Sequence, residues 1–146
     1  MVINIEDSVF GKMEYKHRWY KKEKFSFWGK SWNITVAAKA YSGKAITEQQ
    51  RNSYSWIKQN FSDIEEKMAG MLIDYINKNY MELADEWFGA RRVSISADLS
   101  AIVTPKTLLI KQDGMTVFLF ECPWSESGIG IQVLPEFQIG SQEIFL

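Results

Sequence analysis

The sequence predicts an α+β fold in which a single domain, residues 1–146, packs helices on one face of an antiparallel sheet. Apolar and polar residues alternate over short segments in residues 12–41 and again after Pro105, which is the pattern of half-buried strands. Between these segments, apolar residues recur every three or four positions, as on an amphipathic helix. The composition, 46% apolar and 24% charged, is that of a soluble globular protein. The predicted order is therefore a β-meander, two central helices and a second β-meander.

The first predicted meander contains three strands joined by short turns. Residues 12–20 alternate in polarity, which places His17 on the apolar face of the first strand. A charged turn at residues 21–23 leads to a short second strand, and a turn at residues 29–31 leads to the third strand, residues 32–41.

Two capping signals mark the starts of the central helices. Thr47 and Gln50 have the spacing of a capping box, so a helix is predicted over residues 47–60. Ser62 and Glu65 repeat this spacing, so a second helix is predicted to begin at Ser62.

The second predicted helix carries an apolar stripe on one side. The stripe consists of Ile64, Met68, Met71, Leu72, Tyr75, Ile76 and Tyr80. Gly70 lies inside this helix, where glycine costs about 1 kcal/mol relative to alanine, so we expect a close packing contact there. Residues 84–92 are predicted to be a loop or the end of a helix.

The second meander is predicted to begin with a hairpin. Residues 107–112 and 115–122 are expected to pair across residues 113–114, Asp-Gly, which is the dipeptide of a two-residue type I′ turn. Residues 130–134 form the next strand, and residues 143–146 are predicted to add a short edge strand.

The candidates for catalysis are few, and no catalytic residue, metal or cofactor is predicted. Cys122 and His17 are the single cysteine and the single histidine, which excludes an intramolecular disulfide and a zinc site built from these residue types. Cys122 follows an apolar strand and is predicted to be a buried small hydrophobe; a Cys122–His17 nucleophilic pair is the alternative. Residues 29–31 and 128–130 lack the following helix that a phosphate-binding loop requires. The protein is therefore predicted not to be an enzyme.

The sequence also predicts a cytoplasmic protein that does not span a membrane. No run of 18 apolar residues is present, and the N-terminal residues lack the basic and apolar regions of a secretory signal.

The net charge is only −1, but positive and negative residues are separated along the chain. Residues 12–44 contain nine Lys or Arg and two acids, whereas residues 112–146 contain five acids and no base. This separation favours a polyanionic partner for the first region or a charged protein partner for the second. The alternative is that the two regions lie side by side and neutralise each other.

The basic region has the composition of a surface for single-stranded nucleic acid. Lysine and arginine would contact phosphates, and interleaved aromatic rings would stack on bases. The rings, however, are predicted on the strand face opposite the lysines, which favours core packing of the rings. The predicted nucleic-acid contacts are Lys16, Arg18, Lys21, Lys22 and Lys24.

A series of short motifs resembles a family of small bacterial domains of unknown function, often encoded near polymorphic toxins and regarded as candidate immunity proteins. The resemblance covers residues 9–141. Its motifs are Phe10-Gly11-Lys12-Met13, Trp19, Ile46-Thr47-Glu48-Gln49-Gln50, Thr104-Pro105, Phe120-Glu121-Cys122-Pro123-Trp124, Gly128-Ile129-Gly130-Ile131 and Ile139-Gly140.

The chain departs from that family after the tryptophan. The family pattern there is acid-x-acid-His-Gly, whereas this chain has Ser125-Glu126-Ser127-Gly128. A metal or acid–base role is therefore not expected at this corner, and residues 120–134 are predicted to form a strand, a tight corner and a returning strand.

The resemblance implies a non-enzymatic binding protein that neutralises a cognate toxin by covering it. An acidic surface would complement the basic cleft of a nuclease toxin and would accelerate association. Tryptophan is enriched in binding hot spots, so Trp124 is a predicted anchor. The predicted partner-binding residues are Glu121, Trp124, Glu126, Glu136 and Glu143; a solvated sheet edge is the alternative interpretation.

Overall fold

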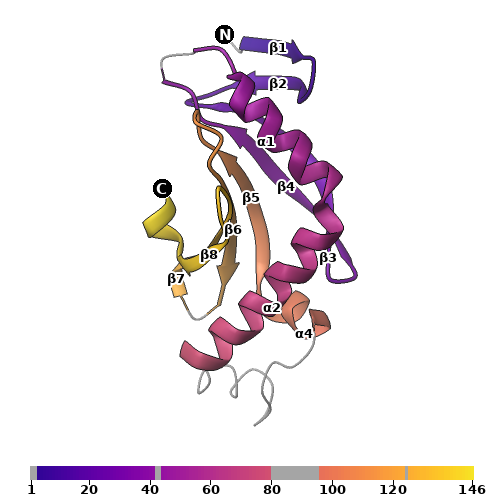
Figure 1. Ribbon diagram of the computed structural model, residues 1–146, viewed down its shortest axis with the longest axis vertical. Coiled ribbons are helices and arrows are strands. Elements are labelled where there is room, and N and C mark those ends of the chain that lie inside the picture. The colour runs from indigo at the N-terminus through magenta and orange to yellow at the C-terminus, as the bar shows by residue number, and fades with distance from the viewer. Residues whose placement is uncertain (1–2, 42–43, 80–95, 124) are drawn as a thin grey trace.

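The computed structural model describes residues 3–41, 44–79, 96–123 and 125–146, and the account below concerns these residues. Eight strands of this part of the chain form one sheet in chain order, β1 to β8 (Figure 1). The α+β prediction is confirmed. The strands are β1 (Ile3–Asp7), β2 (Gly11–Tyr15), β3 (Trp19–Phe27), β4 (Lys30–Ala38), β5 (Thr104–Ile110), β6 (Thr116–Cys122), β7 (Ser125–Leu134) and β8 (Gln138–Ser141). The helices are α1 (Glu48–Gln59), α2 (Phe61–Asn79), α4 (Ser96–Ile102) and the 3-10 helix η2 (Gln142–Phe145).

The sheet is mostly, but not entirely, antiparallel. Strands β4 and β5 are parallel, because the helices lie between them in the chain and return it to the opposite end of the sheet (Figure 1). A parallel pair requires such a crossover, whereas an antiparallel pair needs only a turn. The predicted meanders are therefore joined by one parallel pair at the centre of the sheet.

The two faces of β6 belong to two separate apolar clusters. Phe118 and Phe120 pack in the main cluster, which also contains the buried residues of α1, α2 and α4. Val117 and Leu119 point to the other face, where they form a smaller cluster with Phe145 of η2. Since all residues of β6 except Glu121 are buried, this strand shows the apolar run expected of a central strand.

Residues 12–20 form a hairpin and not the single strand that their alternation predicts. Strand β2 ends at Tyr15 and β3 begins at Trp19, with His17 in the turn at φ 67°. His17 is exposed there, so its predicted place on an apolar strand face is wrong. The three-residue turn preserves the odd–even pattern, because Met13 and Trp19 both pack in the main cluster. Alternation alone therefore could not reveal the turn.

The remaining N-terminal boundaries also differ from the prediction. Strand β1, which pairs with β2, was not predicted, and residues 21–23, predicted as a turn, lie inside β3. The β3–β4 turn lies at Trp28 and Gly29, whose φ values of 50° and 86° are both positive. Positive φ at both central residues is the requirement of a type I′ hairpin turn.

The predicted capping box of α1 is present. The Thr47 side chain accepts a hydrogen bond from the Gln50 N–H at 3.2 Å, and the Gln50 side chain accepts one from the Thr47 N–H at 2.9 Å. These reciprocal bonds fix the helix start where the sequence predicts it.

The start of α2 differs by one residue from its prediction. The helix begins at Phe61, so Ser62 lies inside it, and Glu65 has a different role from the one predicted. The Glu65 carboxylate accepts a hydrogen bond from the Trp28 N–H at 3.0 Å, which ties α2 to the β3–β4 turn. Gly70 is exposed, and a Cβ atom there would meet no atom within 4 Å, so the predicted close packing is wrong. Tyr80 and residues 84–92 lie outside the described residues.

The β5–β6 connection is a three-residue loop and not the predicted two-residue type I′ turn. The Lys111 N–H donates to the Met115 carbonyl at 2.8 Å, and the Gly114 N–H donates to the Lys111 carbonyl at 2.9 Å. Gly114 has φ 94°, but Asp113 does not have positive φ, which a type I′ turn would require.

The C-terminal segment is a 3-10 helix, although residues 143–146 were predicted to form an edge strand. Strand β8 forms the edge, and η2 then packs back onto β7 and β8. A Cβ atom on Gly130 would lie 2.6 Å from the Phe145 ring, and one on Gly140 would lie 2.7 Å from Ile144. These two glycines therefore provide the space that η2 occupies. No helix of the described residues is long and apolar enough to cross a membrane.

Candidate binding surfaces

Two of the predicted acidic residues lie on the side of the sheet that carries η2. Glu121 is exposed on β6 and follows the alternation of Val117 and Leu119, whose face η2 covers. It forms an ion pair with Lys106, with 3.8 Å between Oε2 and Nζ. Glu143 is exposed on η2 and accepts a hydrogen bond from the Ser127 hydroxyl at 2.8 Å.

The structure does not bring Glu136 to the same place. Glu136 lies in the turn after β7, and the length of this strand separates it from the corner where β6 passes into β7. Its carboxylate accepts a hydrogen bond from Gln138 at 3.1 Å. Trp124 and the side chain of Glu126 lie outside the described part of the structure. The predicted acidic set is therefore not one surface.

The helix η2 also presents an apolar side chain that the sequence prediction missed. Ile144 is 67% exposed, while its neighbour Phe145 is buried against Gly130. The edge strand predicted for residues 143–146 would not have shown Ile144 as the exposed residue of a packed helix. The only sequence signal for this packing is the pair of glycines in β7 and β8, which leave space for η2. Glu121, Glu143 and Ile144 together are called the η2 surface below.

The five predicted nucleic-acid contacts are divided among three places. Lys21 lies on the helix side of β3, where its ammonium is 3.1 Å from Glu23 and 2.9 Å from the Tyr54 hydroxyl. Lys22 lies on the opposite face and donates to the Thr35 hydroxyl at 2.7 Å. Lys24 is exposed on the face of Lys22 because it is two residues further along the strand.

The other two basic residues, Lys16 and Arg18, lie in the β2–β3 turn. Three aromatic residues of β3, Trp19, Phe25 and Phe27, are buried in the main cluster. The fourth, Tyr20, lies half-buried on the face of Lys22, where its hydroxyl donates to the Glu14 carboxylate at 2.9 Å. The core packing of Trp19, Phe25 and Phe27, which the sequence analysis favoured, is confirmed, so these three rings are not available for stacking on bases.

Glu23 is the centre of a polar network between β3 and α1. Its carboxylate accepts hydrogen bonds from Tyr54 and Lys58 in addition to the ion pair with Lys21. Burial acts to raise the pKa of Glu23, but the hydrogen bonds from Lys58, Tyr54 and Lys21 hold it below its ordinary value. Burial and the neighbouring Glu23 raise the pKa of Tyr54. The phenol therefore stays protonated as a donor, and the network joins a strand to a helix without supplying a base.

Cys122 and His17 lie at opposite ends of the sheet. Trp19, next to the turn of His17, aligns through β4 and β5 with Thr116 at the start of β6. Cys122 is buried at the other end of β6. The alternative of a nucleophilic Cys122–His17 pair is therefore wrong, and the burial predicted for Cys122 is confirmed.

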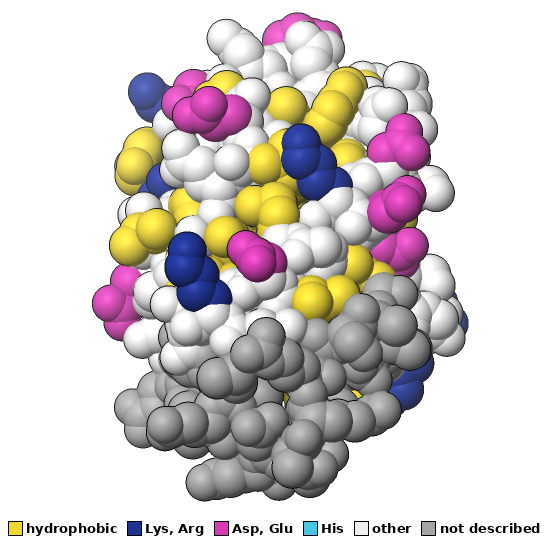
Figure 2. Space-filling model, turned by 60° about the horizontal axis from the view of Figure 1, so that its bottom comes forward, with side chains coloured by type: hydrophobic (Ala, Val, Ile, Leu, Met, Phe, Trp, Pro, Cys, Tyr) yellow, Lys and Arg dark blue, Asp and Glu magenta, His cyan; other side chains and the backbone are white. Residues whose placement is uncertain are grey.

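A surface hollow between α2 and β8 carries both positive and negative side chains. A hollow of about 410 Å³ between α2 and β8 is lined by apolar Met71 and Ile139 and by charged Asp74 and Lys78. Figure 2 shows the molecule from below, where acidic and basic side chains lie among hydrophobic ones. Within the described residues, no group of three or more His, Cys, Asp or Glu side chains could hold a metal ion.

Comparison with known protein families gives a match over most of the chain. The model of a family described as a domain of unknown function (DUF6985) matches residues 9–146. The matched region begins after β1 and includes every other described strand and helix. No curated protein and no solved structure matches the chain.

Proposed function

The chain belongs to the family of the domain of unknown function DUF6985, and we propose that it is a non-enzymatic binding protein that neutralises a cognate bacterial toxin by direct contact. The proposal includes a cytoplasmic location, which the single free thiol of Cys122 suits. The observation that carries the proposal is the η2 surface, where the exposed apolar side chain of Ile144 follows the exposed Glu143 in η2 and Glu121 is exposed on the same side of the sheet.

The η2 surface has the features that a protein interface needs. Ile144 is an exposed apolar side chain, and Glu143 next to it supplies charge. Protein interfaces combine an apolar centre with a polar rim, and acidic groups in the rim accelerate association with a basic partner. The packing of Phe145 on Gly130 holds η2 on the sheet, so little order would have to be gained on binding.

Trp124 and Glu126 remain part of the proposal. In the sequence, Trp124 lies between β6 and β7, and Glu126 is the second residue of β7. Glu136 is not included, because it lies at the other end of β7.

The test uses the product of a toxin-like gene next to the gene for this chain. The two proteins are co-expressed, and complex formation, toxin activity and association kinetics are measured. We expect a stoichiometric complex in which toxicity is suppressed. The variant Ile144→Asp should dissociate at least about 10-fold faster, because it places an unpaired charge in the apolar centre. Loss of two charges in Glu121→Gln/Glu143→Gln should slow association several-fold at low salt.

The matched control is Glu66→Gln, which removes an exposed carboxylate from α2 and should leave both rates unchanged. Circular dichroism establishes that each variant is folded. A folded wild-type protein that neither binds nor quenches the toxin would exclude the proposed function, and unchanged rates in all variants would exclude the η2 surface as its site.

A further inference from the structure

One end of the sheet collects basic side chains from three separate connections. They come from the β2–β3 turn, the segment after β4 and the start of the β5–β6 loop. These residues are called the basic end: Lys16, Arg18, Lys39, Lys44 and Lys111. Only the first two belong to the set that the sequence analysis predicted.

The strand register places three of these residues side by side. Trp19 of β3 pairs with Ala38 of β4, and Ala38 pairs with Ile110 of β5. In each strand, the next residue toward this end of the sheet is basic. Arg18 precedes Trp19, whereas Lys39 and Lys111 follow Ala38 and Ile110, so the three basic residues continue the same row across neighbouring strands. The Lys39 N–H donates to the Ile110 carbonyl at 2.9 Å, which extends the β4–β5 pairing to this row.

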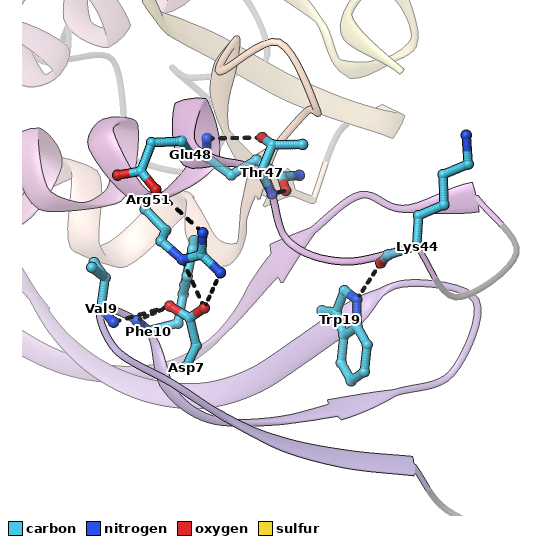
Figure 3. Close-up of polar contacts among 9 residues, drawn as sticks. Asp7, Val9, Phe10, Trp19, Lys44, Thr47, Glu48 and Arg51 are labelled. Carbon is cyan, nitrogen blue, oxygen red and sulfur yellow. Dashed lines mark hydrogen bonds and ion pairs between the residues drawn. The ribbon is translucent and has the colours of Figure 1, made fainter.

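A hydrogen bond holds Lys44 at the same end. The Trp19 indole N–H donates to the Lys44 carbonyl at 2.8 Å, and the Lys44 side chain extends away from this contact (Figure 3). Lys16 is exposed in the turn that also contains Arg18. All five residues therefore lie at the same end of the sheet.

The charges of the basic end are not neutralised within the described part of the chain. No ion pair there joins any of the five residues to an acid, whereas Lys58 and Lys106 each form one and Arg51 forms two. Two acids lie nearby: the Asp113 carboxylate accepts a hydrogen bond from the Met115 N–H at 2.9 Å, and the Glu14 carboxylate accepts one from the Tyr20 hydroxyl at 2.9 Å. Like charges at opposite positions of neighbouring strands are destabilising, so this row is expected to gain from an anionic ligand.

A hollow at the basic end combines two of these lysines with an exposed aromatic ring. The hollow, of about 450 Å³, is lined by Lys39, Lys111, Asp113 and Tyr41 among others. Tyr41 is 63% exposed, and the Lys39 ammonium lies 5.8 Å from the centre of its ring. The Tyr41 ring and the two lysines thus share one surface.

We propose that the basic end binds single-stranded nucleic acid, with Arg18, Lys39 and Lys111 contacting phosphates and Tyr41 stacking on a base. The exposed ring favours nucleic acid over an acidic protein, because bases offer a stacking partner and phosphates carry regular charge. This inference does not depend on the proposed toxin partner, which would meet the η2 surface.

The first experiment measures binding of a fluorescein-labelled 20-nucleotide single strand by anisotropy between 50 and 200 mM salt. Wild-type affinity should fall with salt, because each phosphate contact adds about −0.7 to the slope of log K against log salt. The variant Arg18→Ala/Lys39→Ala/Lys111→Ala should bind at least about 10-fold more weakly at the lowest salt, and its slope should be smaller in magnitude by about 2. Its melting temperature should not fall, because the row of like charges is removed.

The matched control removes the same number of charges from the other end of the sheet. Lys24→Ala/Lys30→Ala/Lys106→Ala should change the affinity by no more than about 2-fold, because these lysines lie toward the opposite strand ends. Equal loss in both triple variants would overturn the assigned site, as would absence of binding by the wild type at 50 mM salt.

The second experiment separates nucleic acid from an acidic protein as the ligand. Tyr41→Ala should weaken oligonucleotide binding about 10-fold, and Tyr41→Phe should not, because stacking needs the ring and not the hydroxyl. Polyglutamate of matched charge serves as a competitor. If it displaces the oligonucleotide at equal charge concentration and Tyr41→Ala has no effect, the basic end recognises acidic protein and the proposal fails.

Discussion

Asp7 shows how one buried charge fixes an entire turn of this protein. Its side chain is 2% exposed, and its carboxylate accepts hydrogen bonds from the Val9 and Phe10 N–H groups, each at 3.0 Å (Figure 3). Arg51 of α1 completes the site, with both its Nε and Nη2 at 2.8 Å from Oδ1. Burial acts to raise the pKa of Asp7, but the bonds from Arg51 and the two N–H groups hold it below its ordinary value.

Asp7→Asn should therefore lower the free energy of unfolding by about 3 kcal/mol at pH 7, because Arg51 loses its buried partner. The matched control is Glu48→Gln, which removes the exposed partner of Arg51 and should cost less than about 1 kcal/mol. A lowered pKa in the folded state means that the stabilisation is complete above the unfolded pKa and is lost as the pH falls through the folded value. Urea unfolding should show the wild-type advantage shrinking below about pH 4. An advantage that is the same at pH 7 and pH 3 would contradict this account.

At the scale of the element, a glycine in α2 and a glycine in β7 have opposite roles. In β7, Gly130 is required, because a Cβ atom would lie 2.6 Å from the Phe145 ring that anchors η2. In α2, Gly70 faces open space and meets no atom within 4 Å. One glycine is thus a packing requirement imposed by a distant segment, and the other is only a weak point in a helix.

Gly70→Ala should raise the free energy of unfolding by about 1 kcal/mol, because alanine restricts the unfolded chain and favours the helix. Chemical denaturation measures the change, and Ala69→Gly is the reverse control: it should destabilise, because Ala69 is buried in the same helix. A Gly70→Ala protein less stable than the wild type would show that α2 needs glycine at this position.

At the scale of the whole molecule, Gln50 joins the two halves of the sheet. It is fully buried, and its side-chain amide donates to the Lys39 carbonyl at 2.9 Å and to the Ile110 carbonyl at 3.1 Å. The Lys39 carbonyl comes directly after β4, and the Ile110 carbonyl is at the end of β5. These two strands are the parallel pair at the centre of the sheet. Gln50, which forms the capping box of α1 with Thr47, therefore also connects the helix to both strands of the parallel pair.

Gln50→Leu should lower the free energy of unfolding by about 2 kcal/mol, because it removes the side-chain donor to the buried Lys39 carbonyl and half of the capping box. Gln49→Ala, at the exposed neighbouring position, should change it by less than about 0.5 kcal/mol. Thermal unfolding followed by tryptophan fluorescence and circular dichroism measures both variants. Equal stability of Gln50→Leu and wild type would remove Gln50 from the closure of the sheet.

Predictions from local patterns were accurate at some positions, such as the start of α1, and wrong at others, such as the turn at residues 113–114. Thr47 and Gln50 marked the start of α1, because a capping box uses groups within a few residues of each other. Ser62 and Glu65 carry the same signal, yet Glu65 binds the Trp28 N–H, a group that lies far away in the chain. The apolar stripe of α2 was predictable because its period is local.

For the candidate sites, the arrangement of strands in the sheet decided which residues lie together. Lys21 and Lys22 are adjacent in the sequence, but alternation along β3 sends them to opposite faces. Conversely, Arg18, Lys39 and Lys111 are far apart in the sequence, and only the register of three strands makes them neighbours. Grouping charges by sequence therefore predicted a basic region, but Lys21, Lys22 and Lys24 of the predicted set do not belong to the basic end.

The sequence by itself determined the α+β class, the start of α1, the aromatic residues that form the core and the separation of charge along the chain, because each follows from composition or short-range period. Only the tertiary structure decided that β4 and β5 are parallel, that η2 packs over Gly130 and that Arg18, Lys39 and Lys111 are neighbours. The physical reason is that strand register and packing are set by contacts between distant segments, which no local pattern contains.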